Sequence, residues 1–338
     1  MKSRVTMRDI AKELKVSVVT VSKALNGKDG VSESLRTLIK GQAEKMKYVY
    51  NSLPHSMLTG RNCNIGILIS VKYLGESSFY WVFFQKLLIA LKQRKYLGIL
   101  ELVTEEDEAN HTIPAFMEAN KVDGFIVLGQ LSDSYLSMLI LQNPCCVFLD
   151  FYSEIGACDC VAANNVLASY KLTKLLIDRG HTKIGFIGTT SATTSILDRY
   201  LGFCKALLEL GLPRGEPIAD RDNRGYFYPE IELDLGTYTA YVCNNDQLAG
   251  KVIQQLRRQG LRIPEDISIA GFDNADNLIT GGVDVTSVEI NISGMCESAV
   301  NAVLQRIEND LYKPQGILWI DAQVIEKQSV IPLQVDCS

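Results

Sequence analysis

Residues 6–26 read TMRDIAKELKVSVVTVSKALN, and this stretch decides the fold of the amino-terminal part of the chain. Its apolar spacing predicts two short helices joined by a tight turn at residues 15–16. In the first helix, Ile10, Ala11 and Leu14 share one face. A compact helical hairpin is therefore expected here.

Capping residues stand where such helices should begin. Thr6 occupies an N-cap position, and Asp9 follows three residues later in a spacing like that of a capping box. Ser17 can cap the second helix. The inward side of that helix carries Val21, Ala24 and Leu25.

The outer arc of the second helix carries Val18, Val19, Ser22 and Lys23. Adjacent valines are unfavourable in water but suit a DNA major groove, where they can contact thymine methyl groups and Lys23 can reach a guanine or a phosphate. The alternative is a helical hairpin whose valines are buried by a later segment. The DNA contacts expected in this stretch are Thr6, Ser17, Val18, Val19, Thr20, Ser22, Lys23 and Asn26.

A third helix should follow the connection GKDGVSES, with Ser32 as its N-cap. Its predicted apolar face consists of Leu35, Leu38, Ile39, Ala43 and Met46. Three helices around one small core would form a helix-turn-helix headpiece over residues 1–47.

The run DIAKELKVSVVTVSKALNGKDGVSESLR, the Tyr48 region, Asn51 and the TGR at residues 59–61 resemble the head of the lactose repressor (LacI/GalR) family of bacterial transcription regulators. The similarity extends over nearly the whole chain. It implies a homodimer that binds double-stranded operator DNA, and a small-molecule effector, such as a sugar, that controls binding.

Residues 48–61, YVYNSLPHSMLTGR, form a predicted linker. The resemblance implies a hinge helix that forms when two copies meet on DNA, with Asn51 as its N-cap and Met57 as the apolar side chain inserted into the minor groove. The alternative is a disordered tether, since short helices are marginal alone.

Charge is divided unevenly along the 338 residues. Residues 1–61 hold 12 Lys/Arg and 5 Asp/Glu, a balance of +7, so the net charge of −5 leaves −12 for the remainder. This asymmetry favours a polyanion as the partner of the head alone.

The nine cysteines are odd in number and lack the paired spacings of metal sites, so they are interpreted as reduced thiols in a cytoplasm. No cofactor or metal is expected. Residues 1–25 contain no continuous apolar core, so we predict neither an export signal nor a membrane segment.

From Ile65 onward, apolar runs alternate with amphipathic stretches, which predicts α/β architecture with parallel sheets in a two-lobed, periplasmic-binding-protein-like body. The expected strands are 65–69, 97–102, 124–128, 147–149, 161–163, 183–187, 241–243, 267–270 and 287–290. The expected helices are 79–94, 113–119, 135–141, 165–179, 199–210, 247–259 and 294–309.

The body should span residues 62–338. The resemblance implies an interleaved chain, with a first lobe of about 62–162 and 292–320 and a second of about 163–291 and 321–338. Because the sequence ends without a heptad tail, a dimer is expected rather than a zipper-built tetramer.

Ligands in doubly wound sheets bind beyond the carboxyl ends of the strands, and an interlobe cleft would serve both sheets. Polar residues that follow strand ends match positions through which the resembled family contacts its effector. The expected ligand-binding residues are Phe79, Asp150, Ser195, Arg199, Asn245 and Asp273.

Carboxylates, an arginine fork and an amide are the groups that recognise polyols. Structural roles compete at several positions: Asp246 is expected to cap a helix, Asp150 could cap or pair, and Phe79 could belong to a core. His181 is expected to be structural. Around residues 220–234 the sequence departs from the resembled family, so no cleft-closing residue can be assigned there.

These features predict a sequence-specific DNA-binding transcription regulator, a repressor controlled by an effector between the lobes. A transport receptor would carry an export signal in place of a basic head. Enzymatic activity is not expected, because phosphate loops, paired catalytic carboxylates and nucleophile motifs are missing from the sequence. A body that answers a partner protein stays open as the alternative.

Overall fold

The structure is a computed structural model that describes residues 5–25, 27, 29–46, 48, 61–74, 79–156, 158–222, 225–275 and 282–333. The chain divides into two compact units, Met1–Cys63 and Asn64–Ser338. We call them the headpiece and the body and describe each by itself.

The headpiece contains three helices: α1 (Met7–Leu14), α2 (Val18–Leu25) and α3 (Glu33–Lys45). Ile10, Val21, Ala24 and Ile39 are fully buried where these helices meet. The predicted apolar face of α3 was wrong at Leu38, which is 56% exposed. Leu38 lies about 100° around the helix from Ile39 and so points away from the core.

The first lobe is built on a six-stranded sheet in which every pairing is parallel, with strand order β10-β5-β4-β3-β1-β2. Its strands are β1 (Asn64–Ser70), β2 (Leu97–Val103), β3 (Gly124–Leu128), β4 (Cys146–Leu149), β5 (Asp159–Ala163) and β10 (Ile317–Ile320). The three central strands are almost wholly buried, as expected of a parallel sheet covered on both faces.

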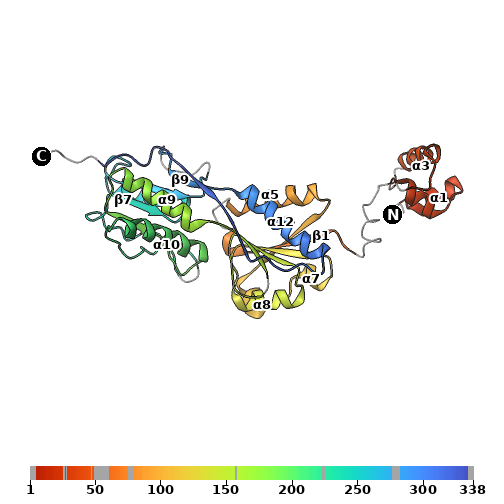
Figure 1. Ribbon diagram of the computed structural model, residues 1–338, viewed down its shortest axis with the longest axis horizontal. Coiled ribbons are helices and arrows are strands. Elements are labelled where there is room, and N and C mark those ends of the chain that lie inside the picture. The colour runs from red at the N-terminus through yellow and green to blue at the C-terminus, as the bar shows by residue number, and fades with distance from the viewer. Residues whose placement is uncertain are drawn as a thin grey trace. The chain divides into compact units, whose positions relative to one another are not determined.

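Helices cover both faces of this sheet. Figure 1 shows α5 (Phe79–Gln93) and α12 (Ile292–Glu308) on one side, and α7 (Ala115–Glu118) and α8 (Asp133–Gln142) on the other. A short 3-10 helix, η1 (Val71–Tyr73), follows β1, and α6 (Glu105–Asn110) follows β2.

The second lobe has a five-stranded sheet of order β11-β9-β8-β7-β6. Its strands are β6 (Ile184–Ile187), β7 (Ala240–Cys243), β8 (Ser268–Phe272), β9 (Thr286–Ile290) and β11 (Ala322–Ile325), and its helices are α9 (Asn165–Asp178), α10 (Thr194–Glu209) and α11 (Asp246–Arg258). The four strands β6 to β9 run parallel, whereas β11 pairs antiparallel with β9. Helices α9 and α10 pack on one face, and α11 on the other.

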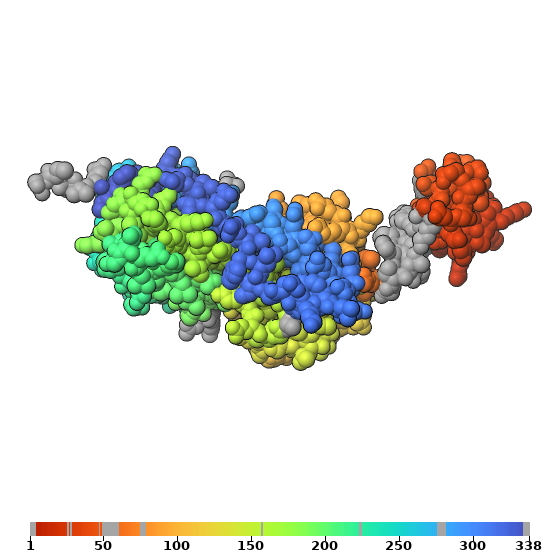
Figure 2. Space-filling model, viewed as in Figure 1, coloured from red at the N-terminus to blue at the C-terminus, as the bar shows by residue number. Residues whose placement is uncertain are grey.

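The chain passes between the lobes more than once. It leaves the first sheet after β5, and after the second sheet's β9 it returns through α12 and β10 before ending its strands with β11. In Figure 2, side chains of the two lobes meet where the ribbons of Figure 1 leave open space. The carboxyl ends of the parallel strands supply the loops between the lobes.

Two predicted helix boundaries were wrong. The expected helix at 113–119 is the shorter α7, which begins after its N-cap Pro114, and α6, which ends at His111 in a left-handed conformation, was not predicted. The α6 sequence EEDEAN has no apolar period, but its acidic first turn suits a helix amino terminus, and Thr104 caps it.

Helix α10 begins at Thr194, five residues before the predicted start at Arg199. Thr193 is its N-cap, and the Thr193 hydroxyl oxygen accepts a hydrogen bond from the Ile196 N–H. The early start places Ser195 within the helix and four residues before Arg199, so both lie on one face.

Candidate functional site

The outer arc of α2 is exposed on the headpiece. Val18 is 41% and Val19 64% exposed, and Lys23 is also exposed. The Ser17 hydroxyl caps the helix by accepting a hydrogen bond from the Thr20 N–H at 3.0 Å. Helix α2 therefore presents two valines and a lysine on one accessible surface, and these valines are not buried by the rest of the headpiece.

Other predicted DNA contacts have structural partners or lie outside the described residues. The Thr6 N–H and hydroxyl both donate to the Asp9 carboxylate, at 2.8 and 2.7 Å, and so begin α1. Asn26, Asn51 and Met57 lie outside the described residues. The contacts expected of these residues with DNA stay predictions.

Arg36 anchors the end of α2, a role that the sequence did not reveal. From α3 its guanidinium donates to the carbonyl oxygens of Ala24, at 3.3 Å, and Lys23, at 3.5 Å, while Glu33 accepts from its Nε at 3.0 Å. These carbonyls lie in the last turn of α2, where helical partners run out. A charged residue on an otherwise apolar helix face was the available signal.

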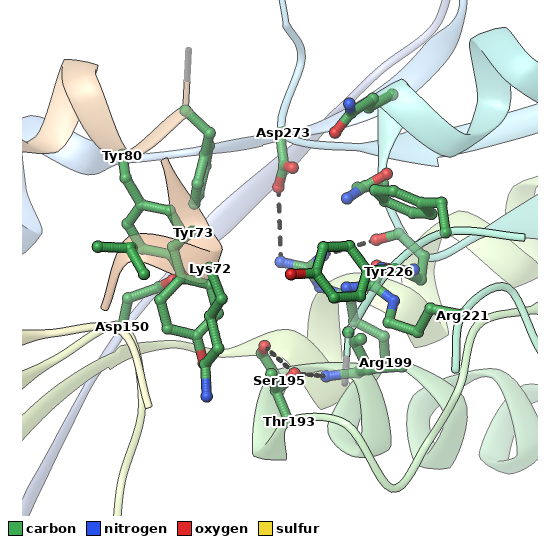
Figure 3. Close-up of a pocket in the computed structure, with 18 of the residues that line it drawn as sticks. Lys72, Tyr73, Tyr80, Asp150, Thr193, Ser195, Arg199, Arg221, Tyr226 and Asp273 are labelled. Atoms are coloured by element: carbon green, nitrogen blue, oxygen red, sulfur yellow. Dashed lines mark hydrogen bonds and ion pairs between the residues drawn. The ribbon is translucent and has the colours of Figure 1, made fainter. Parts of the chain in front are cut away.

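A cavity of about 820 Å³ lies between the lobes at the carboxyl ends of their strands. Figure 3 shows Tyr73, Tyr80 and Asp150 on one side, facing Ser195, Arg199 and Tyr226 on the other. The structure brings all six predicted ligand-binding residues to this pocket: Phe79, Asp150, Ser195, Arg199, Asn245 and Asp273.

Arg199 is the most firmly held of these side chains. It is 5% exposed. Its guanidinium donates to the Asn244 carbonyl at 2.6 Å, to Asn165 Oδ1 at 3.0 Å and to Asp273 Oδ1 at 3.5 Å. It also lies 4.5 Å from the centre of the Phe272 ring. These contacts fix the direction in which the planar donor group meets the pocket.

Asp150 follows β4 and is 7% exposed. The Tyr80 hydroxyl donates to Asp150 Oδ2 at 2.9 Å, whereas Oδ1 has no hydrogen-bond partner among the residues that the structure describes. Burial raises the pKa of Asp150 to about 7, against the opposing effects of the Arg199 charge and the Tyr80 hydrogen bond. The buried Oδ1 atom is thus available to a ligand.

Asp273 follows β8, and burial likewise raises its pKa although Arg199 opposes the rise. Asp150 and Asp273 both have positive φ angles, of 70° and 95°. Strained backbone of this kind is common at functional sites. Two carboxyl groups and one arginine therefore converge on the pocket from the ends of β4, β8 and the start of α10.

The prediction that Asp246 caps α11 was wrong, because Asn245 is the N-cap. Asn245 Oδ1 accepts from the Leu248 N–H at 2.8 Å. Asp246 is buried instead beneath Gly271, and it accepts hydrogen bonds from the Ser287 hydroxyl and the Ala275 N–H. Asn245 therefore combines a structural role with a place in the pocket wall.

Several pocket residues were missed. Lys72, Tyr73 and Tyr80 come from the segment after β1, and Arg221, Tyr226 and Phe227 come from the stretch that departs from the resembled family. Between α10 and β7 the described residues form isolated bridges rather than a strand, including Arg221 with Phe227. Their composition, with two aromatic residues beside an arginine, was the only local signal.

Asp220 holds Arg221 in place. This fully buried carboxylate accepts from Arg221 Nη2 at 2.7 Å, from the Thr189 N–H at 2.7 Å and from Asn244 Nδ2 at 2.9 Å. The Asn244 carbonyl also accepts a hydrogen bond from Arg199. Asn244 therefore contacts both Arg199 and the carboxylate that holds Arg221.

His181 is buried and hydrogen-bonded, as expected of a structural residue. His181 is 2% exposed and lies 3.0 Å from the Ile331 carbonyl and 2.9 Å from the Thr239 hydroxyl. Within the described ranges, no three His, Cys, Asp or Glu residues are placed to hold a metal ion. No described helix is both long and apolar enough to cross a membrane.

Comparisons with known proteins agree with this geometry. Residues 6–51 match the model of bacterial regulatory proteins of the lacI family, and residues 173–330 match that of the periplasmic binding protein-like domain. The chain is 27% identical over 338 residues to the HTH-type transcriptional repressor PurR of Klebsiella pneumoniae (strain 342), with 96% of each chain covered. The PurR of Escherichia coli O139:H28 is 26% identical, with the same coverage.

Solved structures share the fold. The lac repressor dimer bound to operator and the anti-inducer ONPF has a TM-score of 0.78 at 19% identity, with 97% of this chain and 100% of that chain covered. The transcriptional regulator CelR in complex with cellobiose has a TM-score of 0.67 at 20% identity and the same coverage. The chain therefore combines a helix-turn-helix domain of the lacI family with a periplasmic-binding-protein-like body, and it is similar over 96% of its length to the repressor PurR.

Proposed function

We propose that this DNA-binding regulator is a repressor that reads operator DNA through the exposed face of α2 and whose affinity for DNA is set by a sugar or similar polyol in the interlobe pocket. One observation carries the proposal. A headpiece with an accessible valine pair is joined in one chain to a body whose pocket takes hydrogen-bonding groups from both lobes.

The pocket chemistry favours a ligand with several hydroxyl groups. Asp150 and Asp273 can accept hydroxyl hydrogen bonds, Arg199 donates, and Ser195 can do both. Aromatic rings at Phe79 and Tyr73 supply apolar faces on which a sugar ring can pack. CelR, which has the same fold, is described as a cellobiose complex.

Control of DNA binding would follow from the position of the ligand between the lobes. A ligand that contacts both lobes stabilises one relative arrangement of them and so shifts the population of the body. In a homodimer, this arrangement would set the spacing of the two headpieces. A coupling free energy of about 1 to 3 kcal/mol suffices for a several-fold to hundred-fold change in affinity. Because the proposed binding target is operator DNA, we place this activity in the cytoplasm.

Selection from a random-oligonucleotide pool tests the DNA-binding half. Lys23→Ala should reduce discrimination among bases of the selected site by about tenfold, because Lys23 lies beside the valine pair. Lys40→Ala removes the same charge from an exposed position on α3 and should retain discrimination. A pool that yields no enriched sequence would exclude this function.

Thermal unfolding tests the effector half. A sugar that binds the pocket should stabilise the body by RT ln(1 + [L]/Kd), about 2.7 kcal/mol at a hundredfold excess over Kd. Cellobiose and a panel of monosaccharides are suitable probes. Ser195→Ala should weaken the response, whereas Ser137→Ala, on the distant α8, should not. If no sugar stabilises the protein but a partner protein does, the sugar assignment fails.

A further inference from the structure

Helix α10 touches the first lobe through its first two turns. The Thr194 N–H donates to Gln130 Oε1 at 2.9 Å, and the Tyr152 hydroxyl donates to Asp198 Oδ1 at 2.8 Å. Gln130 follows β3 and Tyr152 follows β4, so both partners belong to the first lobe. The loop that bears Gln130 is itself held by the pocket residue Tyr73, whose hydroxyl donates to the Gln130 carbonyl at 2.8 Å.

The same two turns form part of the pocket wall. Ser195 and Arg199 line the cavity, one residue after Thr194 and Asp198 respectively. Residues four apart lie on one stripe of a helix, and the next residue is turned by about 100°. One stripe of α10 therefore contacts the first lobe while the adjacent stripe faces the ligand space, as the positions of Ser195 and Arg199 in Figure 3 illustrate.

The Tyr152–Asp198 hydrogen bond joins a residue of the first lobe to one of the second, and we call this interlobe hydrogen bond the fastening. Asp198 is 4% exposed, and its Oδ2 atom is buried without a hydrogen-bond partner in the part of the chain that the structure describes. The Tyr152 ring also packs edge-on against Trp319 of β10, at 5.3 Å between ring centres. Removing the Tyr152 hydroxyl would deprive a buried carboxyl group of its interlobe donor.

We propose that the first two turns of α10 couple the pocket to the angle between the lobes, and that the Tyr152–Asp198 hydrogen bond, outside the pocket lining, holds the lobes in the arrangement seen here. Tyr152 and Asp198 are positioning residues. The fastening can be tested without ligand or DNA, whereas its effect on regulation rests on the proposed function.

Hydrogen–deuterium exchange of the full chain, read by mass spectrometry without ligand, tests the fastening. The Thr194 amide is a direct reporter because its acceptor lies in the other lobe. Tyr152→Phe should speed exchange in peptides covering residues 193–199 by about three- to tenfold, the effect of losing one hydrogen bond. Tyr135→Phe is the matched control, because the Tyr135 hydroxyl donates to the Thr112 carbonyl at 2.8 Å within the first lobe.

Equal exchange at residues 193–199 in Tyr152→Phe and Tyr135→Phe would overturn the proposal. If Tyr152→Phe instead speeds exchange in β3 and β7 as well, the body has lost stability generally. Two variants of Asp198 then distinguish loss of the fastening from general destabilisation. Asp198→Asn retains an acceptor for the Tyr152 hydroxyl and should exchange at the wild-type rate, whereas Asp198→Ala should exchange faster at residues 193–199. Equal rates for these two variants would also overturn it.

Operator affinity tests the coupling. With a duplex obtained from the oligonucleotide selection, Tyr152→Phe should change the Kd at least threefold relative to Tyr135→Phe. Unchanged affinity would refute the coupling while the fastening stands on its exchange data. Failure of the wild type to bind any duplex would contradict the proposed function and leave the exchange result intact.

Discussion

Asp150 is a buried carboxyl group whose protonation should affect the stability of the body. Its pKa is raised in the folded state to about 7 from an ordinary value of 3.8, chiefly by burial. The folded state therefore binds the proton more tightly than the unfolded state. The resulting stabilisation is complete below pH 3.8 and is lost as the pH rises to about 7.

We accordingly expect Asp150→Asn to be increasingly favourable relative to wild type as the pH rises from 5 to 7.5, by an amount on the order of a few kcal/mol. Urea unfolding followed by tryptophan fluorescence measures it, because Trp81 and Trp319 both lie in the body. Asp266→Asn is the control. Arg262 lowers the pKa of Asp266 to about 2, so the effect of that substitution should be constant in this range. A pH-independent difference for Asp150→Asn would contradict the prediction.

Arg199 illustrates a second property of single residues, the dependence of a buried charge on its partner. Arg199→Met should destabilise the body by about 3 to 5 kcal/mol, since it leaves Asp273 in a buried position without its guanidinium. Arg262→Met removes an exposed partner of Asp266 and should change the free energy of unfolding much less, because water screens an exposed ion pair. Urea unfolding of both variants provides the comparison, and similar losses would refute the role assigned to burial.

At the level of elements, the helices of the headpiece depend on groups supplied by their neighbours. Helix α2 has eight residues, and so short a helix is marginal alone. Its amino terminus is capped by Ser17, and its carboxyl-terminal carbonyls are satisfied by Arg36 of α3. The orientation of the exposed valine pair thus depends on a contact between α2 and α3.

Arg36→Met should therefore weaken operator binding about tenfold or more, because the last turn of α2 loses donors worth about 1 to 3 kcal/mol. Gel-shift titration with a selected duplex gives the affinity, and tryptophan fluorescence should report unchanged unfolding of the body. Lys40→Met, which alters an exposed position on the same helix, serves as the control. If both variants bind alike, Arg36 does not support the reading helix.

At the scale of the whole molecule, charge separates the two units. The first 61 residues carry +7 and the remainder carries −12. Attraction to DNA should therefore arise in the headpiece and be screened by salt, since binding releases counterions from the phosphates. We expect operator affinity to fall at least tenfold between 50 and 200 mM salt, as measured by fluorescence anisotropy. A salt-independent affinity would be inconsistent with a headpiece that binds phosphates.

The amino-acid pattern alone was sufficient for the local chemistry of the chain. Three helices of the headpiece, the capping roles of Ser17 and Ser32, and the parallel strands were predictable because period, capping and burial act between residues close in sequence. The six expected pocket residues were chosen because they lie near strand ends, where parallel sheets bind ligands, and because they match effector positions of the resembled family.

The tertiary structure decided which distant groups meet. Arg36 beneath α2, Tyr80 on Asp150, and Tyr152 on Asp198 join residues 12, 70 and 46 positions apart. The stretch that supplies Tyr226 has no regular period, so the sequence could not place it in the pocket. Such contacts depend on how helices and sheets pack in three dimensions, and an apolar period shows which face of an element is buried but not which residue of another element it meets.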